Sequence, residues 1–179
     1  MRILSFDISA SPGVALLEIK DGKPRLLAVD HLETDSKLTD AQRYHLVEAF
    51  VLNFVYKHVD KSGAQAIVRE KFHRGGSKRG TQLVFGAWAS VDRALAAFGY
   101  TIEQSDEIVA STVKRLVGGR GNAEKDEVAA GVIRILGETS KQYFYTDKGR
   151  LLDDRSDAAA IGLAYAIQNG LIKNEGSEQ

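Results

Sequence analysis

The chain has 179 residues, 44% of them apolar, with no cysteine and with 24 basic residues balanced by 24 acidic ones. This length suits one domain with its own core, and the lack of cysteine excludes disulfides, thiolate metal sites and a cysteine nucleophile. Zero net charge gives no global argument for a nucleic-acid partner, so local charge must supply it. No segment has the pattern of a membrane span or a secretory signal, which predicts a cytoplasmic protein.

The first part of the chain predicts a three-stranded antiparallel meander, then a long helix and a further strand. Short apolar runs mark the strands, and the segment 21–24 marks a turn. Apolar residues at helical spacing predict a helix over 39–59, capped by Thr39 or Asp40. The strands are expected at 2–8, 14–19, 25–33 and 64–69.

The remainder predicts helices alternating with one more strand. That strand is expected at 100–105, and the segment 142–153 is expected to be a loop. Three hairpin-linked strands followed by alternating helices and strands predict an α/β fold, with a mixed five-stranded sheet of three antiparallel and then two parallel strands and helices on both faces. We expect one domain over 1–172 and a polar, disordered tail over 173–179. The helices are expected at 81–98, 110–117, 123–136 and 154–168.

Acidic residues fall at the ends of three of these elements. Asp7 ends the first strand, Glu70 closes the fourth, and Asp154 and Asp157 open the last helix on one face. Simple capping is one interpretation, with Asp7 in a turn and Asp153 or Asp154 at the helix start. Four converging carboxylates would instead need neutralising cations, because desolvated charge is costly. Without histidine or cysteine nearby, such a cluster favours Mg²⁺ or Mn²⁺, and two ions suit phosphodiester hydrolysis.

This pattern resembles the RuvC-type Holliday junction resolvases of the ribonuclease H-like superfamily. In that family an acid on the first strand resembles Asp7, a glutamate closing the fourth strand resembles Glu70, and an acidic D-x-x-D helix start resembles Asp154 and Asp157. The segment TVKRLVGGRGNAEKDEV is similar to the family's segment with lysines on either side of a glycine-containing turn. Lys114 and Lys125 fall on those positions. The resemblance covers residues 2–170.

The resemblance implies a crossover junction endodeoxyribonuclease that acts in DNA recombination and repair. It would be a homodimer that nicks four-way junctions and other branched DNA symmetrically, in a bacterial or phage context. The implied cofactor is two Mg²⁺ ions per active site, with Mn²⁺ also supporting activity. The implied metal ligands are Asp7, Glu70, Asp154 and Asp157, although Asp157 could act on the attacking water instead. Lys125, expected near an Asn122 cap, would face a phosphate, with a solvated lysine as the alternative.

Basic residues near the proposed site predict contacts to DNA phosphates, which set register without reading bases. The loop KFHRGGSKRG after Glu70 carries several of them, and a solvated loop is the alternative. The family has a phenylalanine three residues after the acid, where this chain has His73, with Phe72 one residue earlier; either could stack on bases. This departure predicts weak sequence selectivity. The proposed DNA-binding residues are Lys71, Phe72, His73, Arg74, Lys78, Arg79, Lys114, Arg115 and Arg120.

Two further questions are open at the level of sequence. In the family, the helix corresponding to 81–98 forms the dimer contact; most of its apolar residues should be core, and Trp88 would anchor either the dimer or the monomer core. The alternative functions are a ribonuclease H-like nuclease acting on RNA–DNA hybrids or other branched DNA, and a nonenzymatic module that binds branched DNA. A sugar-kinase-like phosphotransferase needs two large domains, for which this chain is too short.

Overall fold

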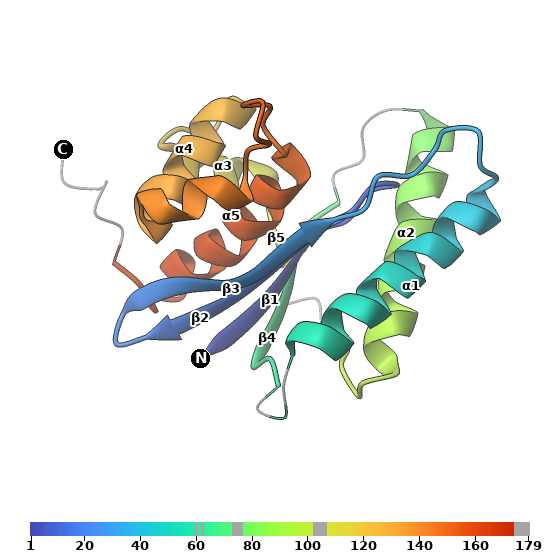
Figure 1. Cartoon of the computed structure of the whole chain (residues 1–179), viewed down its shortest axis with the longest axis horizontal. Coiled ribbons are helices and arrows are strands. Elements are labelled where there is room, and N and C mark those ends of the chain that lie inside the picture. Colours follow the sequence, from blue (N-terminus) through green and yellow to red (C-terminus); the bar gives the residue numbers. More distant parts are fainter. Residues whose placement is uncertain (60, 62, 73–76, 102–106, 174–179) are drawn as a thin grey trace.

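A five-stranded sheet lies between two layers of helices in the computed structural model, which describes residues 1–59, 61, 63–72, 77–101 and 107–173 (Figure 1). The strand order is β3-β2-β1-β4-β5; β1 is antiparallel to β2 and parallel to β4. This confirms the predicted mixed sheet. The strands are β1 (Arg2–Asp7), β2 (Gly13–Lys20), β3 (Lys23–His31), β4 (Ala66–Glu70) and β5 (Glu107–Ile108).

The first three strands form the predicted meander with a tighter turn than expected. Asp21 and Gly22 have φ values of 53° and 73°, which suit a two-residue hairpin turn whose twist matches that of the strands. The predicted turn was 21–24, but Lys23 and Pro24 already belong to β3, and β3 ends at His31 instead of the expected 33. The centre of the sheet is apolar, because Ile3, Leu4 and Phe6 of β1 are fully buried.

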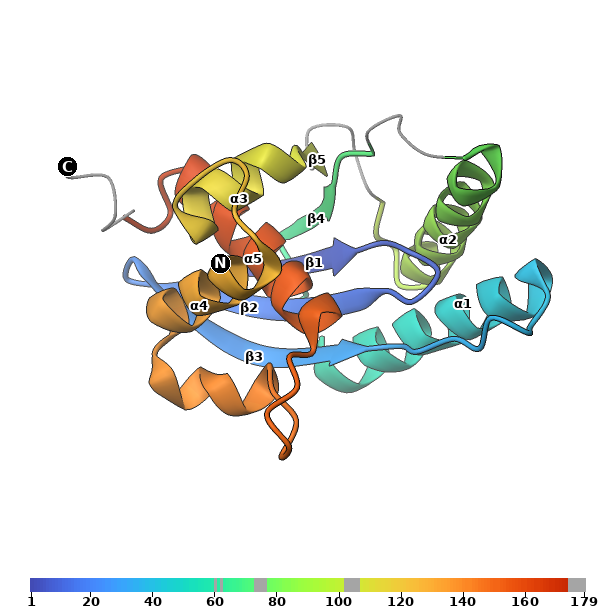
Figure 2. The same ribbon diagram turned by 90° about the horizontal axis from the view of Figure 1, so that it is seen from above.

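Helices α1 (Asp40–His58) and α2 (Lys78–Ala96) cover one face of the sheet (Figure 2). Thr39 caps α1, because its side chain accepts a hydrogen bond from the Gln42 N–H while the Gln42 side chain accepts one from the Thr39 N–H. Ser77 caps α2, which begins three residues before the predicted start, so Lys78 and Arg79 lie on the helix and not in the preceding loop. Large side chains fill this layer, among them Leu4, Phe6, Val47, Val51, Phe54 and Leu95.

Helices α3 (Ala110–Gly118), α4 (Lys125–Leu136) and α5 (Asp153–Gln168), with the short helix η2 (Glu138–Tyr143), cover the other face (Figures 1 and 2). The helix α5 lies against β1 and β2 through small residues, including Ala158 and Gly162. A Cβ on Gly162 would lie 2.6 Å from Leu17 Cδ1 and 2.7 Å from Ser5 Oγ, so the helix approaches the strands closely here. The Ser5 hydroxyl also donates a 2.7 Å hydrogen bond to the Ala158 carbonyl. These contacts fix α5 close to the sheet.

Several predicted boundaries were wrong for local reasons. The fifth strand is the two-residue β5, beyond the expected 100–105; Tyr100 and Thr101 are not in a strand, and 102–106 lie outside the described residues. The predicted loop 142–153 contains the end of η2 and a bridge between Tyr145 and Leu151. Glu124, not Asn122, caps α4, and α5 begins after Leu152 without a side-chain cap.

At the end of the chain, residues 174–179 of the predicted tail lie outside the described part. Among the described residues, no helix is both long enough and apolar enough to cross a membrane.

Candidate active site

The strands β1 and β4 bring two of the predicted acids to one edge of the sheet. Asp7 is the last residue of β1 and Glu70 the last of β4, and parallel neighbours end at the same edge. The partner of Asp7 on β2 is Gly13, and a Cβ on Gly13 would lie 1.9 Å from the Asp154 carbonyl oxygen. The start of α5 therefore contacts the strand next to Asp7. All four acids proposed from the sequence border this edge.

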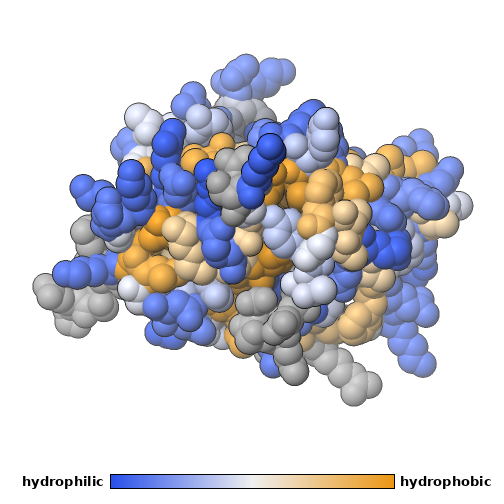
Figure 3. Space-filling model, turned by 90° about the horizontal axis from the view of Figure 1, so that it is seen from below, coloured by the Kyte–Doolittle hydropathy of each residue, from blue (hydrophilic) through white to orange (hydrophobic). Residues whose placement is uncertain are grey.

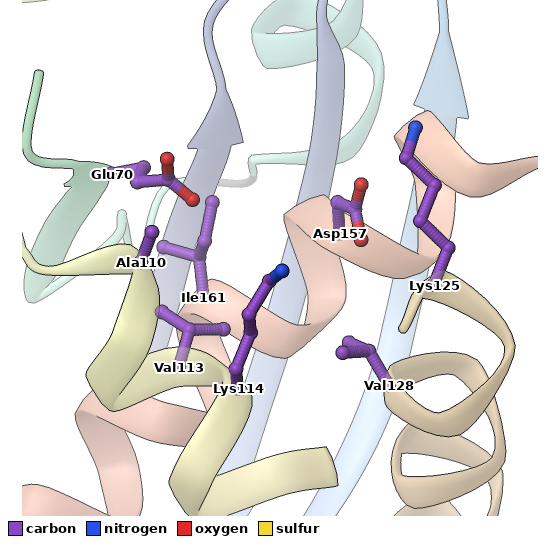
Figure 4. A pocket seen from close by; sticks show the side chains of 8 residues that line it. All are labelled: Glu70, Ala110, Val113, Lys114, Lys125, Val128, Asp157 and Ile161. Carbon is purple, nitrogen blue, oxygen red and sulfur yellow. The ribbon is translucent and has the colours of Figure 1, made fainter. Parts of the chain in front are cut away.

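A small pocket opens at this edge, with charged residues at its rim and apolar residues below them (Figure 4). Glu70 comes from β4 and Asp157 from α5, while Lys114 and Lys125 come from α3 and α4. The pocket has a volume of about 110 Å³. Acidic and basic side chains from four elements thus meet here, as a site that binds both cations and phosphate requires. Its apolar lining consists of Ala110, Val113, Val128 and Ile161.

Three of the acids at this edge have raised pKa values. The pKa of Asp7 lies well above its ordinary value, mainly because the carboxyl is buried, and then because Asp157, Glu70 and Asp154 are nearby. Burial likewise raises the pKa of Asp157 to about 6, although Lys125 opposes the shift. The pKa of Asp154 is raised by burial and by Asp153. Ionising these buried carboxyls is therefore costly in the metal-free chain, and a bound cation would offset that cost.

The donor chemistry fits hard divalent cations. Carboxylate oxygens are the ligands preferred by Mg²⁺ and Mn²⁺, and the raised pKa values show that the folded chain alone does not neutralise these acids. Within the described residues, however, no three acidic or histidine side chains are already gathered closely enough to form a metal shell. Side-chain rotations of the four acids would therefore have to accompany cation binding.

Lys125 makes an ion pair that the sequence did not reveal. Its Nζ donates to the Asp153 carboxylate, and this hydrogen bond is the main reason that the pKa of Lys125 is raised. The same contact lowers the pKa of Asp153, which had been considered only as a helix cap. Lys125 is also the first residue of α4 and does not follow an Asn122 cap. The pairing holds the Lys125 ammonium beside the acids. Because Lys125 and Asp153 are 28 residues apart, their spacing in the sequence does not indicate the contact.

The proposed DNA-binding residues have different surroundings. Lys71, Lys78 and Arg115 are exposed, whereas Arg79 forms a two-pronged ion pair with Asp40 and Arg120 pairs with Glu127. His73 and Arg74 lie outside the described residues.

Phe72 belongs to an aromatic cluster formed with two residues of α2. Its ring centroid lies 5.1 Å from that of Phe85 and 6.0 Å from that of Trp88. Trp88 is half-buried, so its burial agrees equally with a role in the monomer core and with a role as a dimer anchor. Phe85 is 50% exposed, so it is an exception to the expectation that most apolar residues of this helix are core.

A polar network formed by His31, Arg155 and Asp30 lies beside Asp154, and no sequence motif marks it. His31 Nδ1 accepts a 2.9 Å hydrogen bond from Arg155 Nε, and Arg155 Nη2 lies 3.0 Å from an Asp30 oxygen. His31 also borders a cavity of about 180 Å³ together with Asp153 and Asp154. His31 and Arg155 are 124 residues apart, so only the fold brings them together.

Comparison with known proteins places this site in a family context. No family model matches the chain. Over 169 residues, the chain is 28% identical to a crossover junction endodeoxyribonuclease RuvC from Synechococcus sp. (strain CC9605), with 94% of this chain and 99% of that protein covered.

Solved structures give the same result for the fold. The Thermus thermophilus RuvC structure matches with a TM-score of 0.71 at 21% identity, covering 96% of this chain and 98% of that one. The T. thermophilus RuvC in complex with a Holliday junction substrate matches with a TM-score of 0.73 at 20% identity, covering 96% of each chain. The yeast mitochondrial Holliday junction resolvase matches with a TM-score of 0.63 at 12% identity, covering 98% and 81%. At these identities the structural matches establish the fold.

The sequence match spans almost the whole chain, and the fold agrees with it from the central sheet to the last helix. Both confirm the resemblance found in the sequence. Over almost its whole length this chain is therefore similar to RuvC, and it has the ribonuclease H-like fold of the Thermus thermophilus RuvC structures.

Proposed function

We propose that this protein is a crossover junction endodeoxyribonuclease. It hydrolyses phosphodiesters in four-way DNA junctions by paired, symmetric nicks, in recombination and repair, with weak sequence selectivity. The observation that carries the proposal is the meeting of four acids, three of them with raised pKa values, at one edge of a RuvC-type sheet. Such a cluster is costly to fold, and cation-dependent chemistry gives a reason for keeping it.

Asp7, Glu70, Asp154 and Asp157 are proposed to hold two divalent cations, Mg²⁺ by preference and Mn²⁺ as a substitute. Bound cations at such a site lower the pKa of a water molecule and neutralise charge on the leaving 3′ oxygen. Asp157 either binds a cation or orients the attacking water. Lys114 and Lys125 line the same pocket and bind the scissile phosphate, for which Lys125 exchanges the carboxylate of Asp153 for a phosphate oxygen.

The exposed cations around the site are proposed to track the DNA backbone. Lys71, Lys78 and Arg115 can contact phosphates directly, and such contacts make binding sensitive to salt. Arg79 and Arg120 can do so after leaving their carboxylate partners. His73 and Arg74 are retained as proposed contacts from the sequence. Phe72 is retained as a base-stacking candidate beside Glu70.

A homodimer is proposed because two symmetric nicks in one junction require two sites related by two-fold symmetry. We place the contact on α2, where Phe85 is 50% exposed and packs edge-on against Trp88 at 5.8 Å. Figure 3 shows hydrophobic surface on the side of the molecule where α1 and α2 lie. Exposed aromatic residues are common anchors of such interfaces.

The test is cleavage of a labelled, immobile four-way junction beside linear duplex and an RNA–DNA hybrid, in Mg²⁺, in Mn²⁺ and in chelator. Wild-type protein should cut the junction with paired nicks in either metal. The Asp7→Asn variant should bind the junction normally and cut about 1,000-fold more slowly, since losing roughly 4 kcal/mol of transition-state stabilisation has that effect.

The matched control is Asp21→Asn, which removes an exposed acid at the far hairpin turn and should cut at the wild-type rate. Junction binding without cutting in either metal would favour the nonenzymatic module. Preferential cutting of the RNA–DNA hybrid would mean that the protein is a nuclease whose substrate is the hybrid and not the junction.

A further inference from the structure

Arg69, which precedes Glu70 in β4, makes an unusual set of contacts for a residue beside a proposed metal ligand. Its side chain is only 11% exposed. Its guanidinium carbon lies 4.0 Å from the centroid of the Trp88 ring, and its Nε and Nη2 lie 3.2 Å and 3.1 Å from Glu107 Oε1. A further nitrogen, Nη1, lies 3.5 Å from Asp92. One side chain therefore links β4 to α2 and to β5.

These contacts lie on the opposite face of β4 from the proposed site. Successive side chains of a strand point to opposite faces, so Arg69 faces α2 while Glu70 faces the pocket beside Asp157 (Figure 4). A strand end held firmly on one face has little freedom to rotate on the other. The direction in which Glu70 leaves the sheet thus depends on how Arg69 is held.

On the β5 side, backbone pairing within the sheet holds the end of β4 only weakly. The pairing of β4 with β5 covers two residue pairs, Arg69 with Glu107 and Glu70 with Ile108, followed by a 2.7 Å hydrogen bond from the Lys71 N–H to the Ile108 carbonyl. The ion pair of Arg69 with Glu107 joins the side chains of one of these two pairs, and Glu107 is 12% exposed. Ion pairs shielded from water in this way order the groups that form them.

We propose that Arg69 is a positioning residue for Glu70: by clamping β4 to Glu107 and Trp88, it sets the orientation in which Glu70 can bind a divalent cation. This rests on the proposed metal-dependent function. Lysine cannot replace Arg69 fully, because the ammonium lacks the planar fork that contacts Glu107 while stacking on Trp88. Groups that orient a metal ligand typically affect metal affinity or activity by about 10- to 100-fold when removed.

The test uses the double variant Arg69→Gln/Glu107→Gln, which removes both charges of the pair and so avoids leaving one buried charge without a partner. Mn²⁺ binding is measured from the loss of the free-ion electron paramagnetic resonance signal, and cutting from single-turnover rates. We expect Mn²⁺ affinity and cutting each to fall about 10- to 100-fold, while the junction Kd in chelator stays within about 2-fold of wild type. Arg69→Lys should show a smaller loss, as a partial rescue.

The matched control is Arg93→Gln/Glu48→Gln, which removes an ion pair of 2.8 Å between α2 and α1 away from Glu70. The proposal is overturned if the Arg69 double variant binds Mn²⁺ as tightly as this control. If that variant does not fold, the Arg69→Lys variant replaces it as the test. A normal melting temperature with wild-type Mn²⁺ affinity would overturn the proposal, whereas weakened Mn²⁺ affinity would support it. If wild-type protein cuts no junction, the nuclease function fails, while Mn²⁺ binding still judges the role of Arg69.

Discussion

The two faces of the sheet are packed in different ways. On the α1–α2 face, large side chains such as Leu16, Val51 and Phe54 fill the space between helix and strand. On the α5 face, alanines and Gly162 leave the helix backbone almost in contact with β1 and β2. The first face buries more bulk per residue, whereas the second brings a helix terminus onto the ends of two strands.

This difference separates stability from chemistry. Bulky packing on the α1–α2 face supplies hydrophobic stabilisation, and its proposed link to the site is the contact of Arg69 with Trp88. Close packing on the α5 face brings Asp154 and Asp157 to the edge where Asp7 lies, and burial, followed by neighbouring carboxylates, raises the pKa values of these acids. We therefore expect substitutions on the two faces to affect stability and metal binding in different proportions.

The largest effect on stability is expected from Phe54→Ala on the α1–α2 face. Phe54 is 2% exposed, and removing its ring leaves a cavity that should lower the free energy of unfolding by about 3–5 kcal/mol. Urea unfolding measures this loss. Mn²⁺ affinity, measured where the variant is still folded, should equal that of wild type. A parallel loss of Mn²⁺ affinity would contradict the separation of the two faces.

A smaller and more informative effect is expected from adding one methyl group on each face. In Gly13→Ala the new Cβ would meet the rigid Asp154 carbonyl at 1.9 Å, so α5 must shift, at a cost of about 1–3 kcal/mol, with weaker Mn²⁺ binding. In Gly86→Ala the Cβ would meet the Tyr44 ring at 2.0 Å, but that side chain can rotate away, and alanine favours helix by about 1 kcal/mol.

Urea unfolding and Mn²⁺ titration of both variants should therefore show a marked change for Gly13→Ala and almost none for Gly86→Ala. Equal losses in the two variants would mean that the close approach of α5 does not set the site.

A last effect, which needs no substitution to be seen, is expected in the pH dependence of the metal-free protein. Because the pKa of Asp157 is raised from 3.8 to about 6, its stabilising contribution is fully present below pH 3.8 and is lost as pH rises through about 6. Between these values, the free energy of unfolding in chelator should fall with rising pH, and Asp157→Asn should flatten this slope. Asp21→Asn, at an exposed position, should leave it unchanged. Identical slopes in wild type and Asp157→Asn would show that Asp157 titrates normally.

Much of the fold could be predicted from the sequence because local signals and tertiary packing agreed. The cap at Thr39 was among two candidates, and the apolar periodicity after it was correct. The start of α2 was placed too late, because the basic and glycine-rich segment before residue 81 is typical of a loop, whereas Ser77 caps a helix there. The fifth strand was misplaced because β5 is two residues long, too short to leave a pattern.

The candidate site was predicted as a set of acids but not as a set of contacts. Asp7, Glu70, Asp154 and Asp157 could be proposed because each falls at the end of an element, and the fold brings them to one edge. Asp153 as the partner of Lys125, His31 as the partner of Arg155 and Arg69 as a link to Trp88 could not, because each pairing joins elements distant in the chain.

The sequence by itself determined which elements form, in which order, and which of them end in an acid, because periodicity and element ends are local properties of the chain. The tertiary structure decided how closely those ends approach one another and which basic side chains lie beside them. The reason is steric: with Gly13 on β2 and Gly162 on α5, the helix backbone can reach the sheet, and that close approach sets both the burial of the acids and the rise in their pKa values.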